Sequence, residues 1–131
     1  MAVATCIQTP TKFERRTVAN GTGIPIGTIL KLTNGNVAIA SSANNDPFAG
    51  IAWEEKTASD GITEITVAMN GRWSTTTTAA AIGIGVPVSV GGANAIRAAI
   101  EADVALGCEL QARCLNTIGG GGGTAIIDFY F

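Results

Sequence analysis

The chain contains no histidine, and only 14% of its residues are charged. Histidine is the commonest metal ligand and the usual general base near neutral pH, so its absence disfavours most acid–base and zinc chemistry. Soluble domains typically carry roughly 25% charged residues. A surface with so few charges indicates that another protein covers part of it. The other interpretation is a soluble monomer whose surface is rich in Ser, Thr, Asn and Gly.

Cysteines and long apolar runs are also scarce. The three cysteines, Cys6, Cys108 and Cys114, are an odd count without metal-ligand spacing. On one strand Cys108 and Cys114 would lie about 20 Å apart, too far for a disulfide. We therefore expect reduced thiols in a protein made in the cytoplasm. No apolar run approaches the roughly 20 residues that cross a bilayer, and no signal peptide is evident, so we expect no membrane partner.

The pattern from residue 24 onward is short apolar alternations separated by turn residues, which predicts β-structure. Asn34-Gly35 predicts a tight type I′ hairpin turn, and Asp60-Gly61 predicts a second turn. After the second turn, Ile65, Val67 and Met69 share one face of an alternating strand. We predict an all-β fold with one short helix at most. Residues 94–107 leave strand and helix open, because repeat register favours a strand and Ala-rich composition favours a helix.

The second half of the chain repeats the first. Residues 24–40 align with 82–98, which matches Gly27 with Gly85, and residues 48–69 align with 105–131, which matches Lys56 with Arg113. We predict a β domain over 21–131 with internal repeats at about 24–74 and 82–131. Its architecture would be a small barrel or sandwich of two repeated β units.

Residues 1–20 show no clear period and differ from the rest in charge. They carry three basic groups and one acidic group, +3 − 1 = +2, and the remaining 8 − 3 = 5 basic and 10 − 1 = 9 acidic groups give −4. We predict an extended N-terminal arm over 1–20 that faces a partner. The positive charge is too sparse for nucleic acid.

No group of residues supports catalysis. The glycine run 119–123 has no lysine beside it and enters a β-like segment, so it is not a phosphate loop. Glu54 and Glu55 are adjacent and would point to opposite faces of a strand. Glu101 and Asp103 supply too few oxygens for a hard cation. We expect no enzyme, no catalytic residue, no metal site and no cofactor.

The segment order GTILKL, NGNV, AIA, DPFAGIAWEE and DGITEITVAMNGRW resembles the capsid cement and head decoration proteins of tailed phages. Gly27, Gly35, Gly50 and Gly71 match the glycine positions of that family. Over residues 22–74 the order is also similar to the head decoration proteins of lambda-like phages. The resemblance implies a small β fold with an extended N-terminal arm, clustered or trimeric binding to the outside of a capsid, and no catalysis.

These observations predict a structural protein of the virion surface that binds the major capsid protein and stabilises the shell, as a homo-oligomer and most simply a trimer. The competing hypothesis is a self-associating β module of a tail fibre, baseplate or adhesin. Aromatic residues at the centre of the chain and at its end are candidate interface residues. The capsid-binding residues that we predict in the arm are Val3, Ile7, Lys12, Phe13, Arg15 and Arg16, and the possible interface residues are Trp53, Phe129 and Phe131.

Overall fold

The computed structural model describes residues 3–44, 46–99 and 109–129. Those ranges contain strands and one three-residue 3₁₀ turn, Asn34–Asn36, and no α-helix, so the all-β fold is confirmed. The possible helix near residues 101–105 lies outside the described residues. The strands are β1 (Thr5–Gln8), β2 (Phe13–Thr17), β3 (Ile29–Thr33), β4 (Val37–Ala40), β5 (Phe48–Ala52), β6 (Glu64–Ala68), β7 (Arg72–Thr77), β8 (Pro87–Gly92), β9 (Ala95–Ala98), β10 (Glu109–Cys114) and β11 (Thr124–Phe129).

Strands β2 to β6 close into a barrel in the order β2-β4-β3-β5-β6, which we call barrel 1. β2 runs antiparallel to β6 and meets β4 in parallel at Thr17 and Val37. β3 pairs antiparallel with both β4 and β5, and β5 pairs antiparallel with β6.

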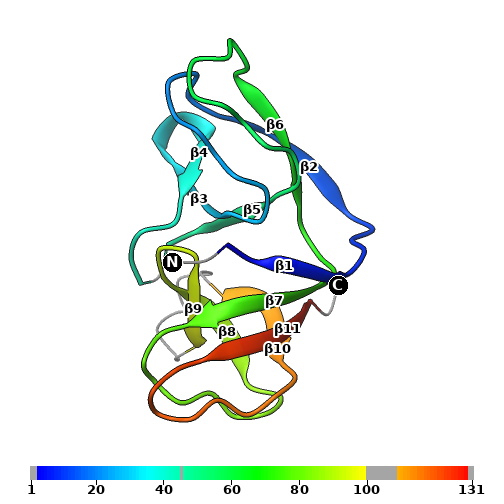
Figure 1. The fold of residues 1–131 in the computed structure, drawn as a ribbon, viewed down its shortest axis with the longest axis vertical. Coiled ribbons are helices and arrows are strands. Elements are labelled where there is room, and N and C mark those ends of the chain that lie inside the picture. The colour runs from blue at the N-terminus through cyan, green and yellow to red at the C-terminus, as the bar shows by residue number, and fades with distance from the viewer. Residues whose placement is uncertain (1–2, 45, 100–108, 130–131) are drawn as a thin grey trace.

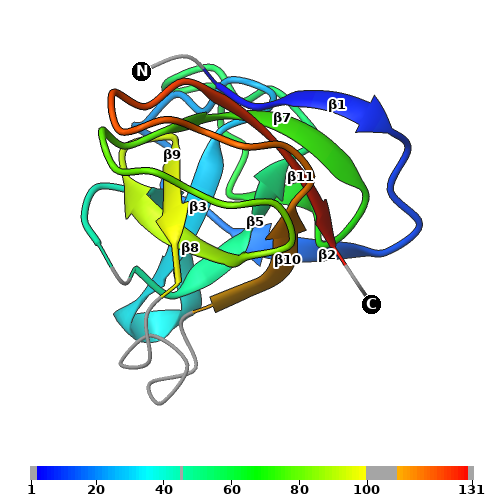
Figure 2. The same cartoon turned by 90° about the horizontal axis from the view of Figure 1, so that it is seen from below.

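Strands β7 to β11 repeat this connectivity and form barrel 2. β7 runs antiparallel to β11 and parallel to β9, β8 pairs with β9 and β10, and β10 pairs with β11. Figure 1 shows the two barrels stacked along the long axis of the molecule, and Figure 2 shows β1, β7 and β11 side by side. The fold is therefore a tandem pair of small barrels with the same strand order.

Hydrogen bonds establish which positions of the two barrels correspond. Gly27 N–H donates to Ala52 O at 2.9 Å, and Gly85 N–H donates to Cys114 O at 2.7 Å. Gly27 and Gly85 are thus equivalent, and both have a positive φ, 89° and 79°. These are the two glycines that the repeat alignment matches.

The alignment fails farther along the chain. The far end of barrel 1 is closed by a mutual backbone pair between Ile24 and Lys56, and the far end of barrel 2 by the same pair between Ile82 and Ile118. Lys56 therefore corresponds to Ile118, and its predicted match to Arg113 is wrong. The alignment slips because the connection from β9 to β10 is longer than that from β4 to β5.

The described part of the N-terminal segment belongs to the two sheets and is not the extended arm expected over residues 1–20. β1 pairs antiparallel with β7, and β2 is a barrel strand along its whole length. No apolar pattern marks β2, FERRT, because four of its five residues are exposed and it lacks the alternation of a half-buried strand.

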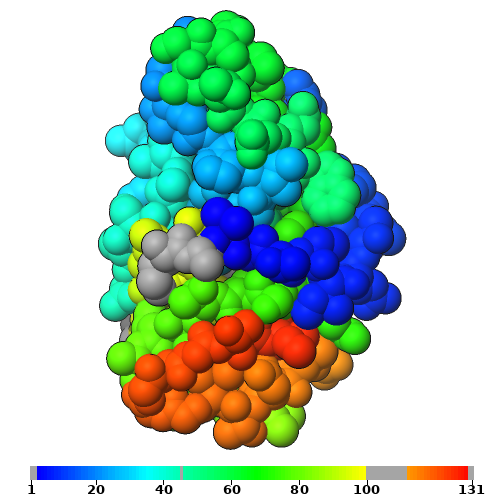
Figure 3. Space-filling model, viewed as in Figure 1, coloured from blue at the N-terminus to red at the C-terminus, as the bar shows by residue number. Residues whose placement is uncertain are grey.

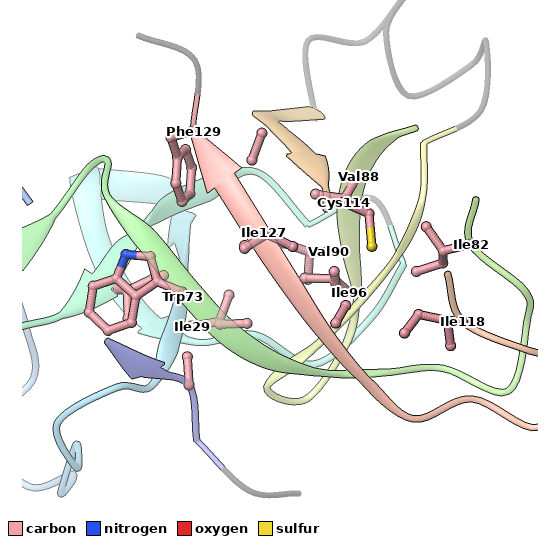
Figure 4. Close-up of a cluster of buried hydrophobic side chains, with 14 of the residues drawn as sticks. Ile29, Trp73, Ile82, Val88, Val90, Ile96, Cys114, Ile118, Ile127 and Phe129 are labelled. Atoms are coloured by element: carbon pink, nitrogen blue, oxygen red, sulfur yellow. The ribbon is translucent and has the colours of Figure 1, made fainter. Parts of the chain in front are cut away.

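Each barrel has an apolar interior, and the larger one reaches across the junction. Leu30, Ile65 and Val67 are among the buried residues that fill barrel 1. The cluster of barrel 2 also contains Ile29 and Ile51, which come from barrel 1. Figure 4 shows this cluster extending from Trp73 and Phe129 at one end to Ile82 and Ile118 at the other, with Ile29 in its middle.

A buried lysine occupies the far end of barrel 1. The ammonium of Lys56 is completely buried and donates to Asn20 O at 2.7 Å, Asp60 Oδ1 at 2.9 Å and Thr57 O at 3.1 Å. A hydrogen bond from Ile62 N–H, followed by that from Lys56, lowers the pKa of Asp60 below its ordinary value. An ammonium with three acceptors is a satisfied buried charge, so we assign Lys56 a structural role.

Candidate interaction surface

The N-terminal segment lies across the junction of the two barrels. Figure 3 shows it in dark blue between barrel 1 above and barrel 2 below. Ala4 N–H donates to Gly27 O at 2.8 Å, while β1 pairs with β7 of barrel 2. A Cβ on Gly27 would clash with Ala4 O, and a Cβ on Gly71 would lie 2.9 Å from Gln8 O. Two glycines thus let the segment approach both barrels closely.

Three aromatic rings lead from the core to the surface beside this segment. Buried Trp73 meets Trp53 edge to face at 6.1 Å, and half-buried Trp53 meets Phe13 at 5.5 Å. Phe13 is 42% exposed. Rings at these separations attract one another, so exposed Phe13 is held in place from beneath.

Two exposed isoleucines lie on neighbouring segments of the junction. Ile7, 51% exposed, is in β1, where its neighbour Cys6 pairs with Trp73. Ile26, also 51% exposed, precedes Gly27, which bonds both Ala4 and Ala52, the residue before Trp53. We name this set of side chains the junction patch: Ile7, Phe13, Ile26 and Trp53.

Sequence reasoning missed Ile26, although a signal was present. Thr28 N–H donates to Pro25 O at 3.2 Å and Gly27 has a φ of 89°, which is the geometry of a type II turn. The second residue of such a turn, here Ile26, points its side chain away from the turn. A Pro-Ile-Gly segment could therefore have been recognised as a turn with a projecting isoleucine.

Arg15, predicted to contact acidic groups of a capsid, is already paired within this chain. Its guanidinium donates to Glu54 Oε1 at 2.6 Å, Glu64 Oε1 at 3.0 Å and Thr66 Oγ1 at 2.9 Å. Hydrogen bonds from Thr66 lower the pKa of Glu54, that from the hydroxyl most and that from the main-chain N–H next. The positive charge of Arg15 lowers it further. All three charged side chains are about half exposed, so we expect little stability from these ion pairs.

The other residues predicted for the arm are divided between surface and interior. Ile7, Lys12 and Phe13 are exposed, whereas Val3 and Arg16 are partly buried. Arg16 Nε donates to Ala49 O at 3.0 Å. The main-chain N–H of Lys12 donates to Asn70 Oδ1 at 3.1 Å.

Of the two residues predicted near the C-terminus, the structure describes only Phe129. Phe129 is buried in barrel 2 and stacks on Phe48 at 5.6 Å, and Phe131 lies outside the described residues. β11 is paired on both sides, with β7 and β10. A shallow, mainly polar pocket of about 240 Å³ lies beside this strand, lined by Gln8, Thr9, Thr11, Asn70, Gly71, Asp128 and Phe129.

Neither chemistry nor similarity identifies a reaction. Among residues 3–44, 46–99 and 109–129, no three Cys, Asp or Glu side chains gather in a way that could hold a metal ion. Within the same ranges there is no helix of the length and apolarity needed to span a bilayer. The chain matches no model of a known protein family and no curated protein. The junction patch is therefore the candidate site that the geometry offers.

Proposed function

We propose that this protein is a structural decoration or cement protein that binds the outer surface of a tailed-phage head. It would bridge neighbouring subunits of the major capsid protein, stabilise the shell, and act as a homo-oligomer without a cofactor. The observation that carries the proposal is the junction patch, in which three of the four apolar side chains, Ile7, Phe13 and Ile26, are exposed, on a chain with unusually few charges.

The patch has the composition of the centre of a protein interface. Its aromatic and aliphatic side chains are of the types that interface cores contain. Exposed charged residues, Lys12 and Glu14, flank Phe13 in β2. Trp53 and Phe13 are held by ring contacts, so little side-chain entropy is lost when they are covered.

The experiment is co-sedimentation of the purified chain with heads assembled from the major capsid protein of the same phage. We expect Phe13→Ser and Ile26→Ser each to weaken binding by at least about tenfold, or about 1.4 kcal/mol. The matched control is Ile84→Ser. Ile84 occupies the equivalent turn of barrel 2 and is 69% exposed but lies outside the patch, so its loss should leave binding unchanged.

A cement function also predicts a change in the shell. A protein that binds only the intact lattice stabilises it by RT ln(1 + [L]/Kd), about 2.7 kcal/mol at 100 times Kd. Heads that carry the protein should therefore release DNA at a higher temperature than bare heads. Binding to tails rather than heads would favour the tail-fibre, baseplate or adhesin hypothesis, and equal binding by all three serine variants would contradict the patch.

Truncation of the N-terminus is not a clean test of this surface. Deleting residues 2–16 removes β1 and nearly all of β2, which pairs with β6 over five positions. We expect that deletion to open barrel 1, so lost binding would report lost folding. Single substitutions of exposed side chains avoid this difficulty.

A further inference from the structure

Among the described residues, barrel 2 carries an added strand, β1, that barrel 1 lacks. On β7, Phe129 N–H donates to Gly71 O and Thr77 N–H donates to Gly123 O, so alternate residues from 71 to 77 face β11. Arg72, Ser74 and Thr76 face the other way. There Thr76 meets β9, and Arg72 and Ser74 meet Gln8 and Thr5 of β1.

The same alternation on β2 leaves an open edge. Met69 N–H donates to Lys12 O and Val18 N–H donates to Thr63 O, so alternate residues from 12 to 18 face β6. Phe13, Arg15 and Thr17 therefore face away from β6. Thr17 meets β4, but within the described chain no strand pairs with Phe13 and Arg15 on that side.

Phe13 and Arg15 are the counterparts of Arg72 and Ser74. The parallel pairs fix this correspondence, because Thr17 pairs with Val37 in barrel 1 and Thr76 pairs with Ala95 in barrel 2. Four residues earlier on each strand, Phe13 pairs with Ala68 and Arg72 pairs with Asp128. In barrel 2 this edge accepts a short extended segment that is not part of the repeated unit. In barrel 1 the edge is exposed.

We propose that the β2 edge at Phe13–Arg15 binds an extended segment of a partner protein as an added antiparallel strand. The occupant is a short segment with a basic residue opposite Glu14 and an apolar residue opposite Phe13. Unlike the proposed function, this inference does not depend on whether the partner is a capsid subunit.

The chemistry of the occupant follows from the side chains beside the edge. Phe13 and Arg15 would make the backbone hydrogen bonds to the added strand, so Glu14 and the residue opposite it form a non-hydrogen-bonded pair. The Cβ atoms of such a pair lie about 4.5–5.5 Å apart. Lys12 and Arg16 are diagonal to that residue at about 7–8 Å, and the guanidinium of Arg16 is bonded to Ala49 O. The nearer carboxylate of Glu14 therefore decides the preference for a cation.

The outer face favours an apolar residue next to Phe13. Phe13 and Trp53 already form an aromatic pair there, and an apolar side chain opposite Phe13 would extend it. Backbone hydrogen bonds give affinity in this mode of recognition, and alternate side chains give specificity.

The test uses synthetic peptides and the full chain. The probe is residues 2–10 of this protein with Cys6→Lys and Gln8→Ile, because Cys6 and Gln8 pair with Trp73 and Arg72, the counterparts of Glu14 and Phe13. The matched control peptide carries Cys6→Glu and Gln8→Ile. We expect the lysine peptide to shift and protect from exchange the amide protons of Phe13 and Arg15, with a Kd of about 1 mM or tighter, and the glutamate peptide to bind at least about tenfold more weakly.

Two variants of the protein separate the backbone from the side chain. Phe13→Pro removes the edge N–H without removing a hydrogen bond to β6, whereas Phe13→Ala keeps that N–H and loses the ring. We expect peptide binding to survive in Phe13→Ala and to be lost in Phe13→Pro. The peptide titration of the natural chain decides the matter if Phe13→Pro does not fold.

Three results would overturn the inference. They are full protection of the Phe13 and Arg15 amides in the free protein, no response to the lysine peptide, or a response confined to Arg72 and Ser74. The same amides measured on head-bound protein then identify the source of the segment. Binding to heads without protection of these amides would retain the proposed function and exclude a head subunit as the occupant.

Discussion

Replacing Lys56 by methionine tests whether the buried ammonium stabilises barrel 1. Methionine is unbranched and only one atom shorter, but it removes the charge and all three hydrogen bonds. The ammonium is completely buried, and the side chain of its partner Asp60 is 22% exposed. Breaking a fully buried pair costs about 3–5 kcal/mol, and hydrogen bonds to charged groups contribute about 1.5–3 kcal/mol each.

The acceptors that remain reduce this cost. Asn20 O still accepts Ser59 N–H at 2.7 Å, and Asp60 keeps the N–H groups of Thr57 and Ile62. Thr57 O loses the one partner described for it, and the apolar methionine no longer has to be desolvated as a cation. We therefore expect a net loss of about 2–4 kcal/mol in the free energy of unfolding.

Urea unfolding followed by tryptophan fluorescence measures this difference. The control is Lys31→Met, because the Lys31 side chain is less buried, at 18% exposed, and its pair with Asp46 is looser, at 3.4 Å, although Lys31 also donates to Ser42 Oγ at 2.6 Å. We expect the control to cost about 1–2 kcal/mol, less than Lys56→Met. A Lys56→Met protein as stable as the natural one, or equal costs for the two variants, would refute the reasoning.

Three further predictions follow from other contacts. Gly27→Ala should destabilise the protein by about 2 kcal/mol more than Gly85→Ala and expose the N-terminus to proteolysis. Both glycines have a positive φ, but only a Cβ at Gly27 would clash, with Ala4 O. Equal losses of stability for the two variants on thermal unfolding would contradict this. In a Cys108→Ser background a thiol reagent should label Cys6 in the folded protein, faster as the pH rises toward the pKa of this thiol, which burial raises; an unreactive protein would place β1 under cover. Folding lowers the pKa of Asp60, so the carboxylate stabilises the protein above its ordinary pKa of about 3.9 and this stabilisation is lost as the pH falls through the lower folded value. Asp60→Asn should therefore flatten the acid limb of a plot of unfolding free energy against pH. An unchanged acid limb would argue against the ion pair with Lys56.

Most of barrel 1 and the start of barrel 2 could be predicted from the sequence. The alternation of Ile65 and Val67 and the turn residues near 34 and 60 correctly indicate antiparallel strands. The details of the first turn differ, because it is a three-residue turn in which both Gly35 and Asn36 have positive φ, 81° and 63°, and not a two-residue type I′ turn. Local patterns thus predict strands better than they predict the geometry between them.

The paired N-terminal strands could not be predicted. β1 and β2 are bound to partners far away in sequence, β7 and β6, and their side chains are exposed, so no apolar period marks them. For the same reason the Arg15 side chain looked available to a partner, although Glu54 and Glu64 neutralise it. Phe13 and Trp53 were recognised as candidates from residue type alone, and only the structure shows that their rings touch.

The shared cluster at the junction has a consequence for synthesis on the ribosome. Barrel 1 needs only residues 13–68 to close, whereas β1 must wait for β7, which ends at Thr77. Until barrel 2 is complete, Ile29 and Ile51 lack the apolar neighbours that bury them in the finished protein. The nascent chain therefore exposes apolar side chains of barrel 1 to solvent while its second half is translated. A pause in elongation after residue 77 would prolong the time in which this surface can aggregate or bind a chaperone.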